Sequence, residues 1–141
     1  MNLVLLKEIV DYGIIGLLIV LNIISLALFI ERLIFFKRLD ASKYKNEKVL
    51  KNALTKNLTI IGSIASNAPY IGLLGTVLAI MITFATIGST PDASKIMQSI
   101  ALALKTTAAG LVVAILSIFF YNILARLIEN ILAHYEEVWF Y

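Results

Sequence analysis

The fold of this chain is decided by APYIGLLGTVLAIMITF, the stretch from Ala68 to Phe84. This stretch is apolar enough to lie in lipid, yet it holds small and hydroxylated residues at places where leucine would bury more apolar surface. On a helix these residues fall on one face, because they are spaced 4, 3, 4 and 3 along the chain: Gly72, Thr76, Ala79, Thr83 and Thr86. An average repeat of 3.5 residues is typical of helices that pack in a left-handed manner.

A second segment carries the same pattern. Its small and hydroxylated residues are spaced 4, 3, 4, 3 and 4: Ala103, Thr107, Gly110, Ala114, Ser117 and Tyr121. A turn signal, Gly88 to Asp92, separates the two segments, so they are predicted to form a helical hairpin. Each helix of this hairpin therefore has one small, polar face.

Two interpretations of these faces stay open on spacing alone. In the first, small residues let membrane helices approach closely, which would make Gly72, Gly75, Ala79, Gly110 and Ala114 packing residues. In the second, hydroxyl groups line a polar lumen, which would make Thr76, Thr83, Thr107 and Ser117 pore residues. Three helices are too few to enclose a conduit, so either interpretation predicts a homo-oligomer.

The composition predicts an all-α integral membrane protein. Of the 141 residues, 60% are hydrophobic and 15% are charged, whereas soluble domains have about 25% charged residues. Charges are absent from residues 12–30, 57–91 and 106–125. Because about 20 apolar residues cross a bilayer as a helix, we expect three crossings, near residues 12–35, 69–87 and 99–121. The chain is then a single membrane domain over residues 1–141.

The basic residues predict the orientation. Seven of the twelve Lys and Arg residues lie between Lys37 and Lys56, whereas the N-terminal segment has only Lys7 and the loop after the second crossing only Lys95. Basic loops stay in the cytoplasm, so we expect the N-terminus outside and the C-terminus inside. No signal-peptide pattern precedes the first crossing. Beside a membrane helix, the basic loop indicates membrane orientation rather than nucleic-acid binding.

Amphipathic patterns continue on the cytoplasmic side. Apolar residues at helical spacing predict a helix from Lys43 to Asn67, within a cytoplasmic helical loop over residues 37–67. Pro69 is expected to mark its entrance into the membrane. No Gly or Pro interrupts residues 111–141, so the third helix should project into the cytoplasm over residues 122–141. The apolar stripe of this projection is expected to pack on the stripe from Val49 to Ile64.

Few charged residues fall inside the crossings. Lys105 either extends to the outer surface or pairs with an acid of another chain, while Glu31 and Arg32 form a pair at the inner rim. No carboxylate is expected at mid-membrane depth, so a proton carrier made of this chain alone would lack a titrating group there. A lone His134, the absence of cysteine and the absence of a nucleophile triad or phosphate loop favour a protein that is not an enzyme and that needs no metal or cofactor.

Three segments resemble the ExbB/TolQ/MotA proton-channel family. The opening stretch resembles its second-crossing motif, LALKTTAAGLVVAILSIFFYN (Leu102 to Asn122) resembles its third-crossing motif, and IERLIFFKRL (Ile30 to Leu39) resembles the segment after its first crossing. The resemblance implies a pentameric ring in the bacterial inner membrane around the helices of an ExbD-like or TolR-like partner, which supplies the membrane aspartate. It also implies that Thr76 and Thr107 are pore threonines, and it favours the lumen interpretation.

The chain departs from the family pattern at three places. Leu102 stands where ExbB proteins often have glutamate, Leu116 replaces a usual proline, and the cytoplasmic loop is short. The short loop disfavours MotA and is most similar to compact ExbB forms. The resemblance therefore implies a proton-channel subunit that works with a TonB-like protein in outer-membrane transport. The alternatives are a TolQ-like subunit for envelope maintenance and a non-conducting membrane scaffold.

Overall fold

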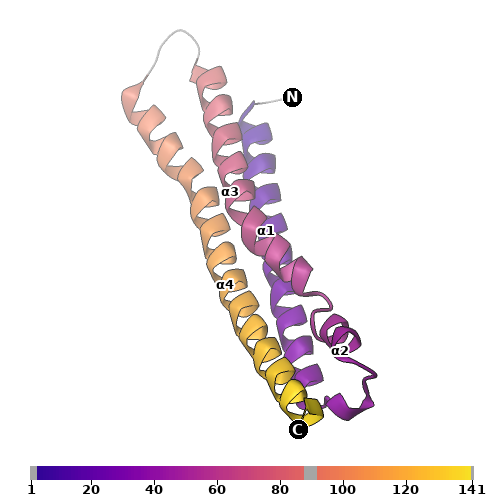
Figure 1. The fold of residues 1–141 in the computed structure, drawn as a ribbon. Coiled ribbons are helices and arrows are strands. Elements are labelled where there is room, and N and C mark those ends of the chain that lie inside the picture. Colours follow the sequence, from indigo (N-terminus) through magenta and orange to yellow (C-terminus); the bar gives the residue numbers. More distant parts are fainter. Residues whose placement is uncertain (1–2, 88–91, 141) are drawn as a thin grey trace.

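The computed structural model describes residues 3–87 and 92–140, and it is helical almost throughout (Figure 1). The elements are α1 (Leu3–Lys37), the short 3-10 helix η1 (Ala41–Lys43), α2 (Glu47–Leu54), α3 (Leu58–Ile87) and α4 (Ala93–Phe140). The predicted turn signal at residues 88–91 lies outside the described residues. The all-α prediction is confirmed.

The three long helices lie side by side, and α3 runs antiparallel to both α1 and α4 (Figure 1). Contacts along the bundle give its register. Lys7 of α1 meets Thr83 of α3, and Ser25 of α1 meets Ser117 of α4. Phe29 and Phe120 stack one turn further along, with ring centroids 4.5 Å apart. The beginning of α1 therefore lies at the same end of the bundle as the end of α3.

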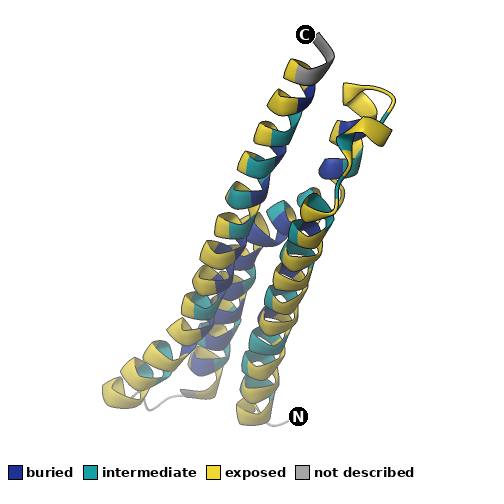
Figure 2. Ribbon diagram, turned by 90° about the horizontal axis from the view of Figure 1, so that it is seen from below, coloured by how far each residue is buried: buried dark blue, intermediate teal, exposed yellow. Residues whose placement is uncertain are grey.

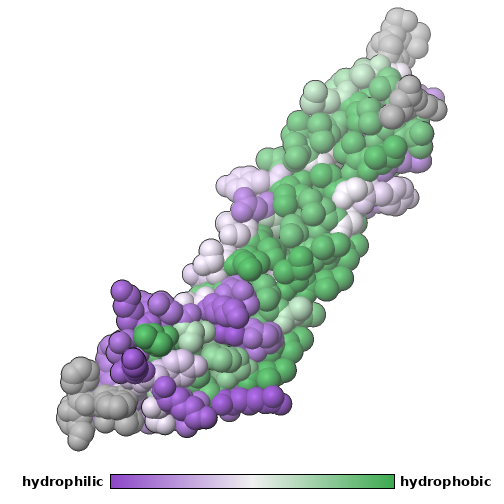
Figure 3. Space-filling model, turned by 90° about the vertical axis from the view of Figure 1, so that its right-hand side faces the viewer, coloured by the Kyte–Doolittle hydropathy of each residue, from purple (hydrophilic) through white to green (hydrophobic). Residues whose placement is uncertain are grey.

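Many large apolar side chains are exposed. The buried residues follow the inner faces of α3 and α4, while the outer faces are exposed (Figure 2). Apolar surface covers most of the length of the molecule, and hydrophilic surface gathers at the end that carries α2 (Figure 3). A soluble monomer rarely exposes apolar patches of more than a few hundred Å². Consistently, α1, α3 and α4 are each long and apolar enough to cross a membrane, as the sequence predicted.

The prediction of one continuous helix from Lys43 to Asn67 is wrong. The structure divides this segment into η1, α2 and the beginning of α3. The Asn46 side chain caps α2 by accepting a hydrogen bond from the Val49 amide, and α2 ends at Leu54. Asn57 then has a φ of 67°, a left-handed conformation that asparagine tolerates better than most residues. Pro69, by contrast, lies inside α3 without ending it.

The predicted contact between the two amphipathic stripes is present. Leu50 and Leu54 of α2 are fully buried against Ile128 and Tyr135 of α4. The Tyr135 hydroxyl also donates a 3.3 Å hydrogen bond to the Tyr44 carbonyl. At about 1.5 Å per residue, α4 is roughly 70 Å long, more than twice the thickness of a hydrocarbon core. Part of α4 must therefore extend beyond the bilayer.

Arg32, near the end of α1, connects this helix to α2. Its side chain is 3% exposed, and its guanidinium group donates a 2.8 Å hydrogen bond to the Ala53 carbonyl and lies over the Phe35 ring. Two further bonds of 2.6 Å reach the Glu31 carboxylate. A buried charge is costly without a partner. Glu31 therefore neutralises the buried Arg32, and Arg32 links α1 to α2 through the Ala53 carbonyl.

Candidate functional site: the hydroxyl cluster between α3 and α4

Two glycines let the backbones of α3 and α4 come into contact. A Cβ atom added at Gly72 would lie 2.5 Å from the Thr106 carbonyl oxygen, and one added at Gly110 would lie 2.5 Å from the Ala68 carbonyl oxygen. Neither obstacle is a side chain that can rotate away. Only glycine therefore fits at these two positions at the observed helix separation.

Three threonine hydroxyls meet at this close contact. Thr76 Oγ1 forms hydrogen bonds with Thr107 Oγ1 and, at 3.1 Å, with Thr106 Oγ1; it also lies 2.9 Å from the Ala103 carbonyl oxygen. Thr106 Oγ1 lies 3.0 Å from the Gly72 carbonyl oxygen. A hydroxyl can both donate and accept, so the three side chains form one connected network, which we call the hydroxyl cluster.

Burial differs among the members of the hydroxyl cluster. Thr76 is 5% exposed and Thr106 is fully buried, whereas Thr107 is half-buried at the edge of the α3–α4 contact. Thr107 is thus the most exposed residue of the hydroxyl cluster. A neighbouring copy or a partner helix on that surface would meet Thr107 first.

The other two predicted pore residues lie apart from the hydroxyl cluster and face α1. Ser117 Oγ donates a 2.9 Å hydrogen bond to Ser25 Oγ. Thr83 Oγ1 donates to the Ala79 carbonyl oxygen at 2.8 Å and lies 3.4 Å from Lys7 Nζ. Both side chains are buried within one subunit. Pore lining by Thr76, Thr83, Thr107 and Ser117 stays a prediction.

The predicted packing residues lie at the helix contacts. Gly72 and Gly110 meet directly, and a Cβ atom on Gly75 would lie 2.8 Å from Thr106 Oγ1. Ala79 and Ala114 are buried. The last residues of the two seams, Thr86 and Tyr121, are exposed.

Thr106 is the residue that the sequence analysis missed. From Ala103, a step of three residues reaches Thr106 and a step of four reaches Thr107, and both steps keep the helical spacing before Gly110. The spacing of the seam therefore cannot separate the two threonines. The pair of adjacent threonines was the available signal.

Lys105 points away from the helix contacts. It is exposed, and it makes no hydrogen bond or ion pair with the residues at 3–87 and 92–140. Its ammonium group is therefore accessible to another chain. Likewise, no group of three or more potential metal ligands occurs among the described residues.

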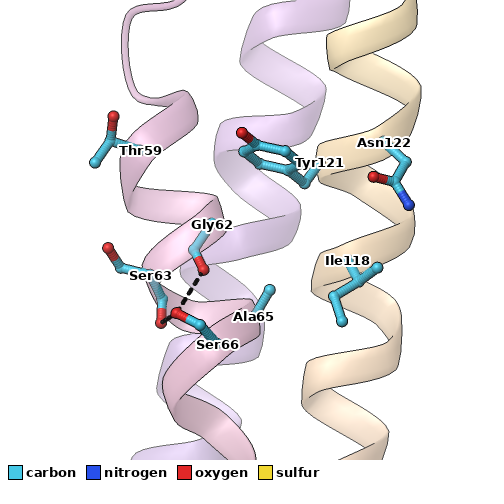
Figure 4. A pocket seen from close by; sticks show the side chains of 8 residues that line it. All are labelled: Thr59, Gly62, Ser63, Ala65, Ser66, Ile118, Tyr121 and Asn122. Carbon is cyan, nitrogen blue, oxygen red and sulfur yellow. Dashed lines mark hydrogen bonds between the residues drawn. The ribbon is translucent and has the colours of Figure 1, made fainter.

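A second polar region lies between α3 and α4 toward the α2 end (Figure 4). It is a cavity of about 480 Å³ that Thr59, Ser63, Ser66, Tyr121 and Asn122 help to line. The Ser66 hydroxyl lies 3.0 Å from the Gly62 carbonyl oxygen and 3.2 Å from that of Ser63. This region is separate from the hydroxyl cluster, whose members Thr76 and Thr106 are buried.

Known proteins are similar to most of this chain. Residues 27–137 match the MotA/TolQ/ExbB proton channel family. The putative biopolymer transport protein ExbB-like 2 of Helicobacter pylori is 51% identical over 92% of this chain and 88% of its own length. The biopolymer transport protein ExbB of Aquifex aeolicus is 45% identical over 94% and 90%, respectively. These matches confirm the resemblance, and the chain belongs to the MotA/TolQ/ExbB proton channel family.

Proposed function

We propose that this chain is the channel subunit of an inner-membrane complex that uses the proton gradient to power TonB-dependent transport across the outer membrane. The observation that carries the proposal is the hydroxyl cluster, in which buried Thr76 holds the hydroxyl of half-buried Thr107. This arrangement places a hydroxyl-bearing residue, Thr107, at the partly exposed edge of the α3–α4 contact. A proton path along an aspartate-bearing partner helix needs such a group.

The proposal includes a ring of identical subunits, most simply a pentamer. Three membrane helices are too few to enclose a conduit, so the proposed conduit forms between copies. The outer face of α4 offers apolar side chains for contacts between copies or with lipid, among them Leu111, Val112 and Ile115. The N-terminus would lie in the periplasm, and α2 with the end of α4 would lie in the cytoplasm, as the seven basic residues of the loop favour.

Reconstitution tests this function directly. The purified chain is placed in liposomes with and without an ExbD-like single-pass partner, a pH gradient is imposed, and proton flux is measured. We expect flux only with the partner, because it supplies the membrane carboxylate. Native mass spectrometry of the same preparation should show a homo-oligomer. A stable monomer would contradict the ring, and an assembled complex without flux would favour the scaffold alternative. Flux with a TolR-like partner instead would favour the TolQ-like role.

Lys105 is proposed to pair with an acidic residue of the partner. Its exposure on α4 and its lack of a partner within the described residues support this role. A lysine in a crossing is costly unless it is paired or reaches the interface. Lys105→Met should therefore weaken co-purification of the partner while leaving expression unchanged. Full partner binding and full flux in this variant would mean that Lys105 only extends to the membrane surface.

A further inference from the structure

A groove runs between α1 and α3 in the half of the bundle that carries α2. Its cavity of about 350 Å³ has mostly apolar walls, which include Leu21, Ile24, Ile60, Ile64 and Ile71. Ile24 and Ile60 are 39% and 46% exposed, so the groove opens to the outside of the subunit. Ligand pockets range from about 300 to 1,000 Å³, so this groove has room for one slender apolar group.

The groove spans one half of the membrane. The charge-free run of α1, residues 12–30, is about 28 Å long as a helix, which matches the thickness of a hydrocarbon core, and Leu21 lies at its middle. On α3 the lining residues extend from Thr59 to Ile71, about 18 Å along the helix. The groove therefore runs from the middle of the membrane to its surface on the α2 side, which is the depth that an acyl chain of that leaflet occupies.

Two hydroxyl groups at the α2 end of the groove have no hydrogen-bond partner within residues 3–87 and 92–140. They belong to Thr59 and Ser63, which are exposed and point away from Tyr121 of α4 (Figure 4). By contrast, the Ser66 and Thr83 hydroxyls further along α3 each donate to a carbonyl oxygen four residues earlier. A free hydroxyl can donate to an ester carbonyl, and a diacyl phospholipid has its ester carbonyls just below the phosphate.

The surface beyond this end of the groove is positively charged. Residues 37–56 hold seven basic and two acidic residues, a net charge of +5, and all seven basic side chains are exposed at the hydrophilic end of the molecule (Figure 3). Lys56 precedes Thr59 by three residues and lies near enough to Glu31 for their charges to interact. The Glu31 carboxylate is already bound by two 2.6 Å hydrogen bonds from Arg32, so the Lys56 ammonium group remains available to an anion.

We propose that the groove between α1 and α3 binds one anionic phospholipid of the leaflet on the α2 side. One acyl chain lies in the groove, the ester carbonyls accept hydrogen bonds from Thr59 and Ser63, and the phosphate lies at Lys56. A zwitterionic lipid fits the groove equally well, but the basic surface repels the cationic group of its headgroup. This inference concerns lipid binding and does not depend on proton conduction.

Native mass spectrometry of the purified chain in mild detergent tests this site. Dioleoyl phosphatidylglycerol and dioleoyl phosphatidylcholine, which differ only in the headgroup, are titrated separately, and the lipids bound per subunit are counted. We expect the wild type to bind the anionic lipid about fivefold more tightly, because a lysine near the membrane surface contributes about 1 kcal/mol to the attraction of anionic lipid. Lys56→Gln should abolish this preference.

Lys45→Gln is the matched control for the headgroup contact, because it removes the same charge far from the groove. Lys45 follows Tyr44, whose carbonyl accepts a hydrogen bond from Tyr135 of α4. Tyr135 is about 21 Å along α4 from Tyr121, which packs against Gly62 at the level of the groove. Lys45→Gln should therefore keep the preference for the anionic lipid.

Two substitutions at Ser63 test the position of the acyl chain. Ser63→Leu fills part of the groove and should weaken the binding of both lipids by about fivefold or more, the low end of overpacking effects. Ser63→Ala leaves the groove open and should bind both lipids within about twofold of the wild type, since a net hydrogen bond contributes little. The unfolding midpoint of each variant shows whether the helices still pack normally.

Several results would overturn this site. Equal binding of the two lipids by the wild type, or an equal loss of preference in Lys45→Gln and Lys56→Gln, would mean that Lys56 holds no headgroup. Unchanged binding by Ser63→Leu with a normal unfolding midpoint would mean that the acyl chain lies outside the groove. If the wild type binds neither lipid, the proposal fails, and a neighbouring copy of the chain is the remaining occupant of the groove.

Discussion

Replacing Gly110 with alanine is expected to destabilise the α3–α4 hairpin, and replacing it with valine should prevent normal assembly. The added Cβ atom would lie 2.5 Å from the Ala68 carbonyl oxygen and 3.0 Å from Gly72 Cα. Backbone atoms cannot rotate away, so the helices must separate. Overpacking costs about 1–3 kcal/mol and occasionally more. Separation would also weaken the hydrogen bonds of Thr76 with Thr106 and Thr107.

The measurement is the midpoint temperature of unfolding of the purified protein in mild detergent. Gly13→Ala is the matched control, because an added Cβ atom there meets nothing within 4 Å and alanine favours a helix by about 1 kcal/mol. Gly75→Ala should be intermediate, since its closest obstacles are the Thr106 and Ile14 side chains. Equal midpoints for Gly110→Ala and Gly13→Ala would contradict the backbone contact.

Periodicity predicted much of this fold, because membrane helices have a simple requirement. An apolar run of sufficient length becomes a helix, since its backbone groups must be satisfied internally. The two seams also predicted which faces of the hairpin are small. Gly72 and Gly110 could be recognised because no larger residue allows helices to approach so closely.

Finer features depended on contacts between segments distant in sequence. Thr106 and Thr107 have equivalent spacing, and only the rotation of α4 against α3 separates the buried hydroxyl from the one at the edge. The break at Asn57 depends on one left-handed residue, which the apolar spacing around it does not reveal.

The threonines of the hydroxyl cluster give the second prediction with a large effect. Thr76→Val and Thr107→Val should assemble normally yet lose most proton flux and proton-driven uptake, whereas the corresponding Thr→Ser variants should retain much of both. Valine keeps the shape of threonine and removes the hydroxyl. A hydroxyl that steadies a charged partner group contributes about 1–3 kcal/mol, which corresponds to about a 5- to 150-fold effect.

Thr106→Val is the control that this geometry provides. Thr106 belongs to the same network, and its hydroxyl lies 3.1 Å from that of Thr76, but it is fully buried, whereas Thr107 is half-buried. We therefore expect Thr106→Val to lower the unfolding midpoint as much as Thr107→Val does while leaving flux per assembled complex close to that of the wild type. Thr106→Val and Thr107→Val each remove one hydroxyl from the same cluster. The difference in flux between these two variants therefore measures what the half-buried Thr107 hydroxyl contributes beyond packing. If Thr76→Val and Thr107→Val assemble and support wild-type flux and uptake, these hydroxyls only pack the hairpin, and the path that protons take must lie elsewhere.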